Sequence, residues 1–229
     1  MTTQAYILHH HPLEPRCRRV RLALAEKSLA CQLILEKPWE PSADYLALSP
    51  NGDVPTLVVQ QPDSPVILGD AGAICEYLEE TVAGHALLAG TPAERAEIRR
   101  LTAWFETRLA GDVTQAILGE KVIKRLSGLG QPDSLLIRQA CTAIHDHLDY
   151  IAWLAERRNW LAGERISLAD LAAAAQLSVI DYLGDVPWER HPEAKSWYAR
   201  IKSRPSFRSL LGDHIAGLLP PRHYADLDF

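Results

Sequence analysis

The segment His9–Leu24, HHHPLEPRCRRVRLAL, gathers side chains that can bind metals or act as nucleophiles: three consecutive histidines, a cysteine and several arginines. In an extended strand, the side chains of His9, His10 and His11 alternate between the two faces, so they cannot converge on one metal ion. We therefore expect solvated or hydrogen-bonded histidines and no metal site. Cys17 is either a nucleophile or a core residue, and the frequent burial of free cysteines favours the core.

The composition excludes several classes of protein. The chain has 229 residues and a formal net charge of -5, which argues against a general binder of nucleic acid or of membrane surfaces. Its four cysteines form no CxxC pair, so neither a disulfide framework nor a zinc ribbon is expected. No apolar run approaches the roughly 18 to 20 residues that cross a bilayer, and the first residues do not resemble a secretory signal. These features predict a cytoplasmic protein without membrane insertion.

The elements that position these side chains can be predicted from local patterns. Residues 4–8, 31–36, 56–59 and 66–68 are predicted strands, and residues 18–25, 45–48 and 71–81 are predicted helices. The order is β-α-β-α-β-β-α. In the first helix, Arg18, Arg19 and Arg21 alternate with apolar residues and are expected to reach solvent.

From Pro92 onward the pattern becomes helical. Helices are predicted over 93 to about 125 and 134 to about 157, separated by GLGQPD. The run SLADLAAAAQLSVIDYL is apolar nearly all round and predicts a buried central helix, with Ser167 and Asp170 as a capping box. The expected organisation is an N-terminal domain over 1–83, a helical domain over 92–219 and a tail over 220–229.

Three motifs, LSPNGDVPTL, AICEYLEE and LAGERISLADL, occur in this order within the predicted frame. Together they resemble the cytosolic glutathione transferase superfamily, over residues 4 to about 211. The resemblance implies an α+β protein with a thioredoxin-like N-terminal domain followed by an all-α C-terminal domain, usually as a homodimer. It does not establish transferase activity, because one fold carries many functions.

Two positions depart from what the family implies for glutathione binding. Where similar bacterial transferases have a serine before the proline, this chain has Glu14, and a carboxylate raises the pKa of a neighbouring thiol instead of lowering it. After Asp70, Ala71 replaces the usual hydroxyl residue, which removes a hydrogen bond to a charged group. We predict no catalytic residue and no cofactor, although Tyr6 is an alternative thiolate partner. The resemblance implies a vestigial glutathione site made of Glu14, Val54, Pro55, Asp70 and Ala71.

Other features indicate a surface for a protein partner. Trp39 lies in the proline-flanked loop KPWEPS, where it either binds a partner or covers the domain junction. The segment GEKVIKRL is either a contact surface or a solvated helix face, and the tail PPRHYADLDF is either an interaction element or disordered. The candidate partner-binding residues are Trp39, Glu120, Lys121, Lys124, Arg125, Tyr224, Asp226, Asp228 and Phe229.

Taken together, these three segments resemble division factors of alphaproteobacteria that have the glutathione transferase fold and bind FtsZ. The resemblance implies a non-catalytic homodimer that binds FtsZ filaments in the cytoplasm at the division site, and that regulates filament architecture and cell constriction. The alternative is an active glutathione transferase with an atypical thiolate-stabilising residue.

Overall fold

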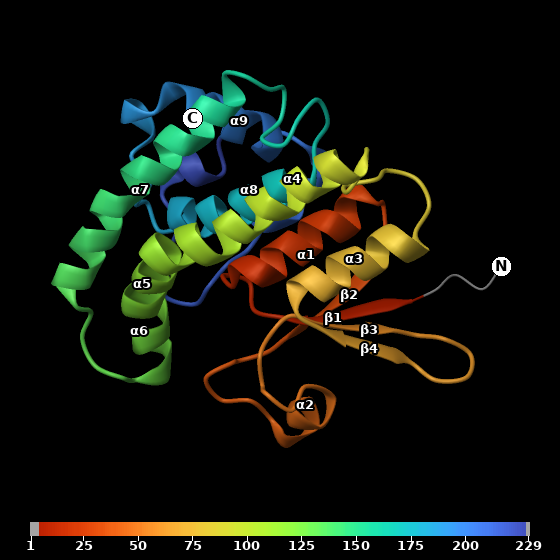
Figure 1. The fold of residues 1–229 in the computed structure, drawn as a ribbon. Helices are drawn as coiled ribbons and strands as arrows, with labels where there is room; N and C mark the ends of the chain where they lie inside the picture. The colour runs from red at the N-terminus through yellow and green to blue at the C-terminus, as the bar shows by residue number, and fades with distance from the viewer. Residues whose placement is uncertain (1–4, 228–229) are drawn as a thin grey trace.

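The computed structural model describes residues 5–227 and consists of a small mixed sheet followed by a helical region, as the predicted α+β class requires (Figure 1). The strands are β1 (Tyr6–His10), β2 (Cys31–Leu35), β3 (Thr56–Val59) and β4 (Val66–Gly69). Their order is β2-β1-β3-β4, with β1 and β2 parallel and the other two pairs antiparallel. The first strand lies further along the chain than predicted, because the backbone of His9 still pairs with Ile34 on one side and Thr56 on the other.

The N-terminal half contains the helices α1 (Pro15–Glu26), α2 (Ala43–Leu48) and α3 (Ala71–Thr81). Figure 1 shows α1 and α3 together on one face of the sheet, with α2 on the other side. Leu8, Leu57 and Val59 are fully buried in the layer beneath the helices. The predicted bounds of α3 are confirmed, since Asp70 caps its first turn.

The named elements of the C-terminal half are all helical. Its main elements are α4 (Pro92–Trp104), α5 (Gln115–Leu118), α6 (Lys124–Ser127), α7 (Ser134–Ala155), α8 (Leu168–Tyr182), α9 (Pro192–Lys202) and α10 (Arg208–Leu211). Two π-helical segments, Phe105–Thr114 and Gly119–Ile123, join α4, α5 and α6 into one path, which corresponds to the predicted helix 93–125. Three single 3₁₀ turns are Trp188–Arg190, Pro205–Phe207 and Arg222–Tyr224.

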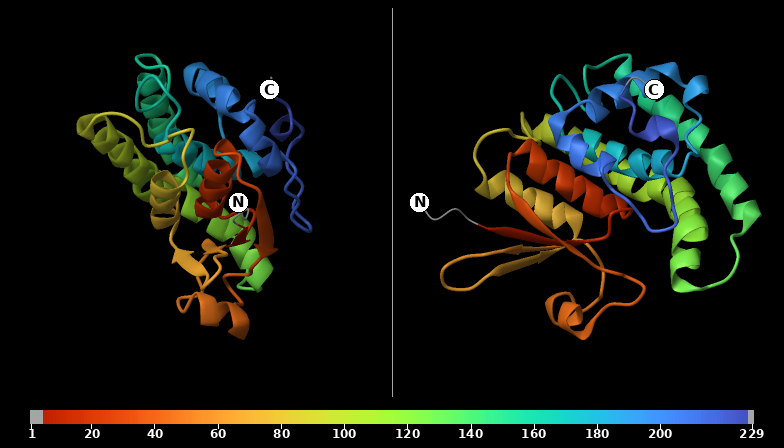
Figure 2. Two further views of the ribbon diagram at one scale, coloured as in Figure 1. Left: turned by 90° about the vertical axis from the view of Figure 1, so that its right-hand side faces the viewer. Right: turned by 180° about the vertical axis from the view of Figure 1, so that it is seen from behind.

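Helix α8 is the centre of the molecule, as predicted, because all of its residues are buried. Its capping box is present, and Asp170 Oδ2 accepts the backbone N–H of Ser167 at 3.0 Å. Asp170 Oδ1 accepts from the N–H of Leu161 and from the indole of Trp197, so the buried carboxylate is fully hydrogen bonded. Figure 2 shows from two sides that α8 lies next to α1. This contact joins the N-terminal and C-terminal halves.

Within residues 5–227, no helix combines the length and the apolar character that crossing a bilayer requires.

Candidate functional site

The start of α1 is capped by Glu14, the residue that stands at the family's serine position. Its carboxylate accepts the backbone N–H of Arg16 at 3.4 Å and the Arg16 Nε–H at 2.8 Å. Both contacts are local, so the carboxylate serves the first turn of its own helix. A side chain that holds a helix end in this way supplies no donor to a thiolate.

Cys17 is fully buried, which confirms the prediction that it is a core residue. Burial raises the pKa of its thiol far above the ordinary value, and the neighbouring Glu14 carboxylate raises it further. The thiol packs against Tyr45 and Val54. It is therefore protonated and inaccessible at neutral pH, and Cys17 is not a nucleophile in this conformation.

The three histidines are all buried, so of the two predicted alternatives, solvated or hydrogen-bonded rings, solvation is wrong and hydrogen bonding is confirmed for His9. His9 Nδ1 lies 2.7 Å from a Glu36 carboxylate oxygen, whereas His11 packs edge-on against Trp39 with ring centroids 5.2 Å apart. Burial, followed by nearby arginines, lowers the pKa of His10 to about 3 and that of His11 to about 4. Among the described residues, no group of His, Cys, Asp and Glu is suited to hold a metal ion.

The start of α3 is also occupied by its own capping carboxylate. Asp70 Oδ1 accepts the N–H groups of Gly72 at 2.6 Å and Ala73 at 3.2 Å. Helix N-termini bind carboxylates through such free N–H groups, and here two of them are already satisfied. Ala71 is 1% exposed and offers no hydroxyl. The Val54-Pro55 peptide bond, just before β3, is cis. Of the residues predicted for the vestigial site, Glu14 and Asp70 thus have carboxylates that are engaged within the chain.

Tyr6, the alternative thiolate partner, belongs to the main hydrophobic core and is 5% exposed. Burial, followed by the neighbouring Tyr77, raises the pKa of its hydroxyl. This position does not favour a role for Tyr6 in stabilising a thiolate.

The three arginines of α1 are buried, so the prediction that they reach solvent was wrong. Arg18 is 0% exposed, and Arg19 and Arg21 are 3% and 6% exposed. The helical period showed correctly that they lie apart from the sheet-facing residues, but the C-terminal half covers that side of α1. Arg19 donates to Glu106, and Arg21 Nη1 donates to Asp213 Oδ2 at 2.8 Å. These long-range ion pairs compensate for the burial of the charges.

Arg18 connects four separate segments. Its Nε donates to the carbonyl of Pro12 at 2.6 Å, and its Nη1 donates to Ser178 Oγ at 2.9 Å and to the Tyr224 hydroxyl at 3.0 Å. Its Nη2 donates to Asp213 Oδ2 at 3.3 Å. Although burial alone lowers it, the pKa of Arg18 is raised by Tyr224 and Asp213, so the guanidinium stays charged. Sequence reasoning missed this residue, because Asp213 and Tyr224 lie far away along the chain.

The tail is docked on the protein at Tyr224, and this corrects the prediction that Tyr224 binds a partner. Tyr224 is 0% exposed, and its ring packs with Leu13, Val122 and Tyr182. Its hydroxyl accepts a hydrogen bond from Arg18 and donates one to the carbonyl of Leu210. Beyond it, Asp226 and Leu227 are exposed. The other two predicted tail residues, Asp228 and Phe229, lie outside the described residues.

The segment 120–125 also differs in part from the prediction. Glu120 is buried, because its carboxylate accepts the backbone N–H of Asp133 and the ammonium of Lys124, each at 2.6 Å. Lys121 is paired with Asp185 at 2.6 Å. Arg125 is exposed and has no carboxylate partner among the residues that the structure describes. The three basic residues line one cavity of about 590 Å³ with the loop 128–132.

The three predicted segments meet around the residues that precede α1. Trp39 contacts His11, and Leu13 is packed in one hydrophobic cluster with Val122 and Tyr224. The guanidinium of Arg125 reaches the segment 213–219, where a Cβ on Gly217 would lie 3.0 Å from it. The segments that carry Trp39, the basic cavity and Tyr224 therefore each contact buried His11 or Leu13, just before Glu14, and we call this region the composite surface.

Comparisons with known proteins agree with this fold. The family model described as "Glutathione S-transferase, N-terminal domain" matches residues 15–81, and the C-terminal domain model matches residues 139–205. FtsZ-localized protein A of Caulobacter vibrioides is 48% identical over 222 residues, which cover 97% of each chain.

Two solved structures are similar over nearly the whole chain. FzlA from C. crescentus has a TM-score of 0.96 at 47% identity, and a glutathione S-transferase from Rhodospirillum rubrum F11 has a TM-score of 0.94 at 51% identity. Each covers 98% of this chain and 100% of its own. With both halves matched, the chain belongs to the glutathione S-transferase family.

Proposed function

We propose that this chain is a non-catalytic member of the family that binds FtsZ filaments at the division site in the cytoplasm, where it regulates filament architecture and cell constriction. The observation that carries the proposal is the 48% identity to FtsZ-localized protein A over 97% of both chains. The composite surface supports it, because Trp39, Arg125 and the docked tail lie around one region.

The self-capped helices α1 and α3 support the absence of transferase activity. The carboxylates of Glu14 and Asp70 each accept a backbone N–H of their own helix, and Cys17 is buried. The arrangement offers no hydroxyl or thiol of the kind that activates glutathione at the two positions implied by the family.

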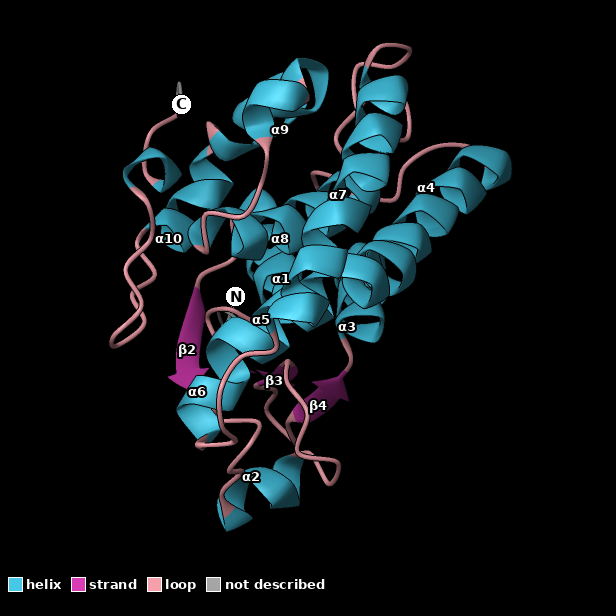
Figure 3. Cartoon of the chain, turned by 90° about the vertical axis from the view of Figure 1, so that its left-hand side faces the viewer, coloured by secondary structure: helices cyan, strands magenta, loops and turns pink. Residues whose placement is uncertain are grey.

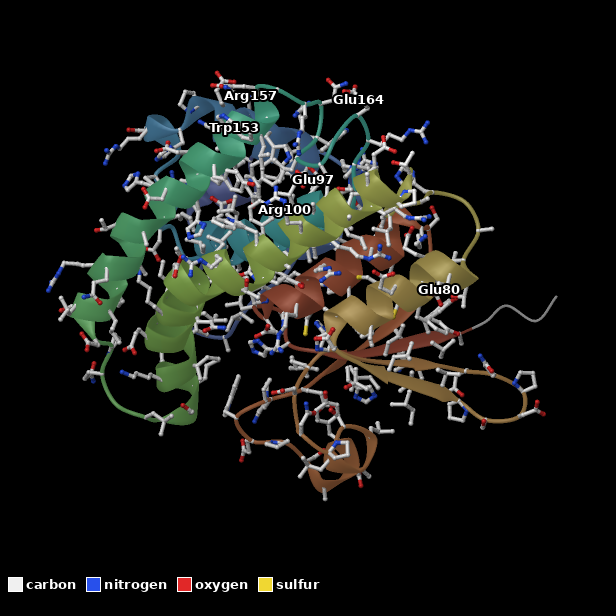
Figure 4. All side chains as sticks on the ribbon, in the orientation of Figure 1. Glu80, Glu97, Arg100, Trp153, Arg157 and Glu164 are labelled. Atoms are coloured by element: carbon white, nitrogen blue, oxygen red, sulfur yellow. The ribbon has the colours of Figure 1, made fainter. Side chains whose placement is uncertain are left out.

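We further propose that the protein is a homodimer. Figure 4 shows Trp153 of α7 and Arg157, which follows α7, near Glu97 and Arg100 of α4 at one face. Trp153 is 46% exposed, stacks on Tyr150 and carries the Arg157 guanidinium 4.5 Å from its ring centre. An exposed aromatic with charged groups of both signs around it suits an isologous contact, in which each group meets its counterpart. A dimer would present the composite surface twice and so bind filaments with avidity.

The decisive experiment is co-sedimentation of the purified protein with FtsZ polymers, with FtsZ kept unpolymerised as the control. We expect the protein in the pellet only with polymers, and Arg125→Glu should reduce the bound fraction without changing the thermal midpoint. Light scattering should give the mass of a dimer, and Trp153→Asp should give that of a monomer. A wild-type protein that stays in the supernatant would exclude filament binding.

The second candidate function is glutathione transfer, which is favoured by the 51% identity to the protein called a glutathione S-transferase from Rhodospirillum rubrum. A conjugation assay with a general electrophilic substrate separates the two. Turnover comparable with that of an ordinary transferase would favour the enzyme.

A further inference from the structure

The segment 213–219, which we call the hairpin, is held to the rest of the protein at its first residue. Asp213 accepts from Arg21 at 2.8 Å and from Arg18 at 3.3 Å through the same oxygen, Oδ2. The side chains of both arginines are at most 5% exposed, and that of Asp213 is 9% exposed. Charge-assisted hydrogen bonds in such a dry environment are strong, so the start of the hairpin is fixed against α1.

A second anchor closes the hairpin. Ile215 and Leu218 form an antiparallel bridge across the turn Ala216-Gly217, and Gly217 has the positive φ of 76° that this turn requires. The Tyr182 hydroxyl accepts the N–H of Ile215 at 3.2 Å and donates to the carbonyl of Leu218 at 2.8 Å. Its ring packs edge-on against that of Tyr224, at 5.1 Å. One buried tyrosine thus holds both strands of the hairpin.

The outer side of the hairpin is exposed. Leu219 is 92% exposed, the highest value among the large hydrophobic residues that the structure describes. A single exposed leucine is ordinary on a protein surface. Leu219 differs because it follows a backbone that buried arginines and a buried tyrosine hold in place. Figures 2 and 3 show the hairpin projecting at the edge of the molecule, beyond α10 (Arg208–Leu211).

We propose that the hairpin is a preorganised docking element, with Leu219 as the apolar anchor and Arg18 as a positioning residue. This inference rests on the proposed function, since the partner is FtsZ. The complementary patch on FtsZ is an apolar pocket with a carboxylate at its border, because Arg125, which has no carboxylate partner within residues 5–227, lies beside Gly217. A side chain presented on a fixed backbone loses little conformational freedom on binding, which is how a small contact becomes an anchor.

The first test is co-sedimentation of Leu219→Ser with FtsZ polymers. We expect binding at least tenfold weaker than that of the wild type, with an unchanged thermal midpoint because the side chain has almost no contacts. The matched control is Ile67→Ser, an exposed apolar residue of β4, which should bind as the wild type does. If wild type and Leu219→Ser bind equally, the docking element is wrong while the proposed function stands. If the wild type does not bind, the docking element and the proposed function are both wrong.

The second test concerns positioning and uses hydrogen exchange of the Ile215 and Leu218 amides. Tyr182→Phe keeps the ring in the core but removes the hydroxyl, so we expect faster exchange of Ile215 and severalfold weaker binding. Arg18→Met should have the larger effect on both readouts, and Arg18→Lys should restore part of the protection by keeping a cation near Asp213. Leu219→Ser should weaken binding with no change in exchange. Unchanged exchange in both Tyr182→Phe and Arg18→Met would overturn the positioning role.

Discussion

The ligand positions of the family and the hairpin both lie near the N-terminal half of α1, and they use polar groups in opposite ways. At the starts of α1 and α3, Glu14 and Asp70 satisfy N–H groups of their own helices, within two or three residues along the chain. At the hairpin, Arg18, Arg21 and Tyr182 hold a segment that is distant in sequence. The first region has its binding groups engaged locally, whereas the second uses buried groups to present an exposed surface. The same helix therefore begins with a locally satisfied cap and, within its next two turns, carries arginines that contact a segment distant in sequence.

The largest expected effect comes from removing the buried charge. Arg18→Met leaves the Asp213 carboxylate partly unpaired and the Tyr224 hydroxyl without its donor, and breaking a buried pair typically costs about 3–5 kcal/mol. The matched control is Arg16→Met on the same helix. The Arg16 side chain is 42% exposed. An exposed pair contributes about 0–1 kcal/mol. Denaturant unfolding measures both, and equal losses would contradict the contrast between the two regions.

Acid should weaken the region around His11. The folded-state pKa of His11, about 4, lies below the unfolded value near 6.5, so the unfolded chain binds the proton first. Stability is fully present above pH 6.5 and falls as the pH drops towards 4, by about 1.4 kcal/mol per pH unit for this one group. Arg18 and Asp213 face the ring and act in opposite directions. Unfolding curves for His11→Asn should show a shallower slope in this range, and an unchanged slope would contradict the burial argument.

A smaller effect is expected at the α3 cap. Asp70→Ala removes the acceptor for Gly72 and Ala73, which costs about 0.5–2 kcal/mol. Asp133, which caps α7 in the same way with an ordinary φ of -81°, provides the comparison. Because Asp70 has a φ of 68°, alanine is strained there, and Asp70→Ala should cost more than Asp133→Ala. Thermal unfolding of the two variants measures the difference.

The smallest expected effect is on catalysis. The double variant Glu14→Ser with Ala71→Ser restores both hydroxyls, but the remaining groups need not be arranged for the reaction. We expect turnover to stay near zero, with at most weak glutathione binding by calorimetry. A turnover restored to that of an ordinary transferase would show that the two hydroxyls were all the site lacked.

Much of the fold could be predicted from the sequence, because its signals are local. The bounds of α3, the short α2 and the capping box at Ser167 follow from caps, prolines and apolar periods within a few residues. The burial of Cys17 was also predicted, from residue type. The strand β1 was misplaced because histidines do not look like strand residues, although the ladder continues through them.

The candidate site was predicted less completely. Helical periodicity identified the side of α1 that carries Arg18, but not what covers that side. The position of Tyr224 after two prolines in a polar segment predicts a contact residue, whereas its hydroxyl completes a buried network. Its partner lies 206 residues away, and no local pattern contains that information. Trp39 was predicted as a contact residue from its type and loop position, and Arg125 from its place on a charged helical segment, whereas the contacts of both segments are visible only in the structure.

The reach of the Arg18 contacts also has a consequence for biosynthesis. Asp213 and Tyr224 follow Arg18 by 195 and 206 residues, so both leave the ribosome long after the first helix has been made. The Arg18 guanidinium is 0% exposed in the native state, but until its partners are made it has to remain hydrated. That side of α1 therefore stays exposed to water. Nascent chains fold from the N-terminus as they emerge. Here the first half cannot reach its final packing early, and closure of the molecule waits for residues 213–224.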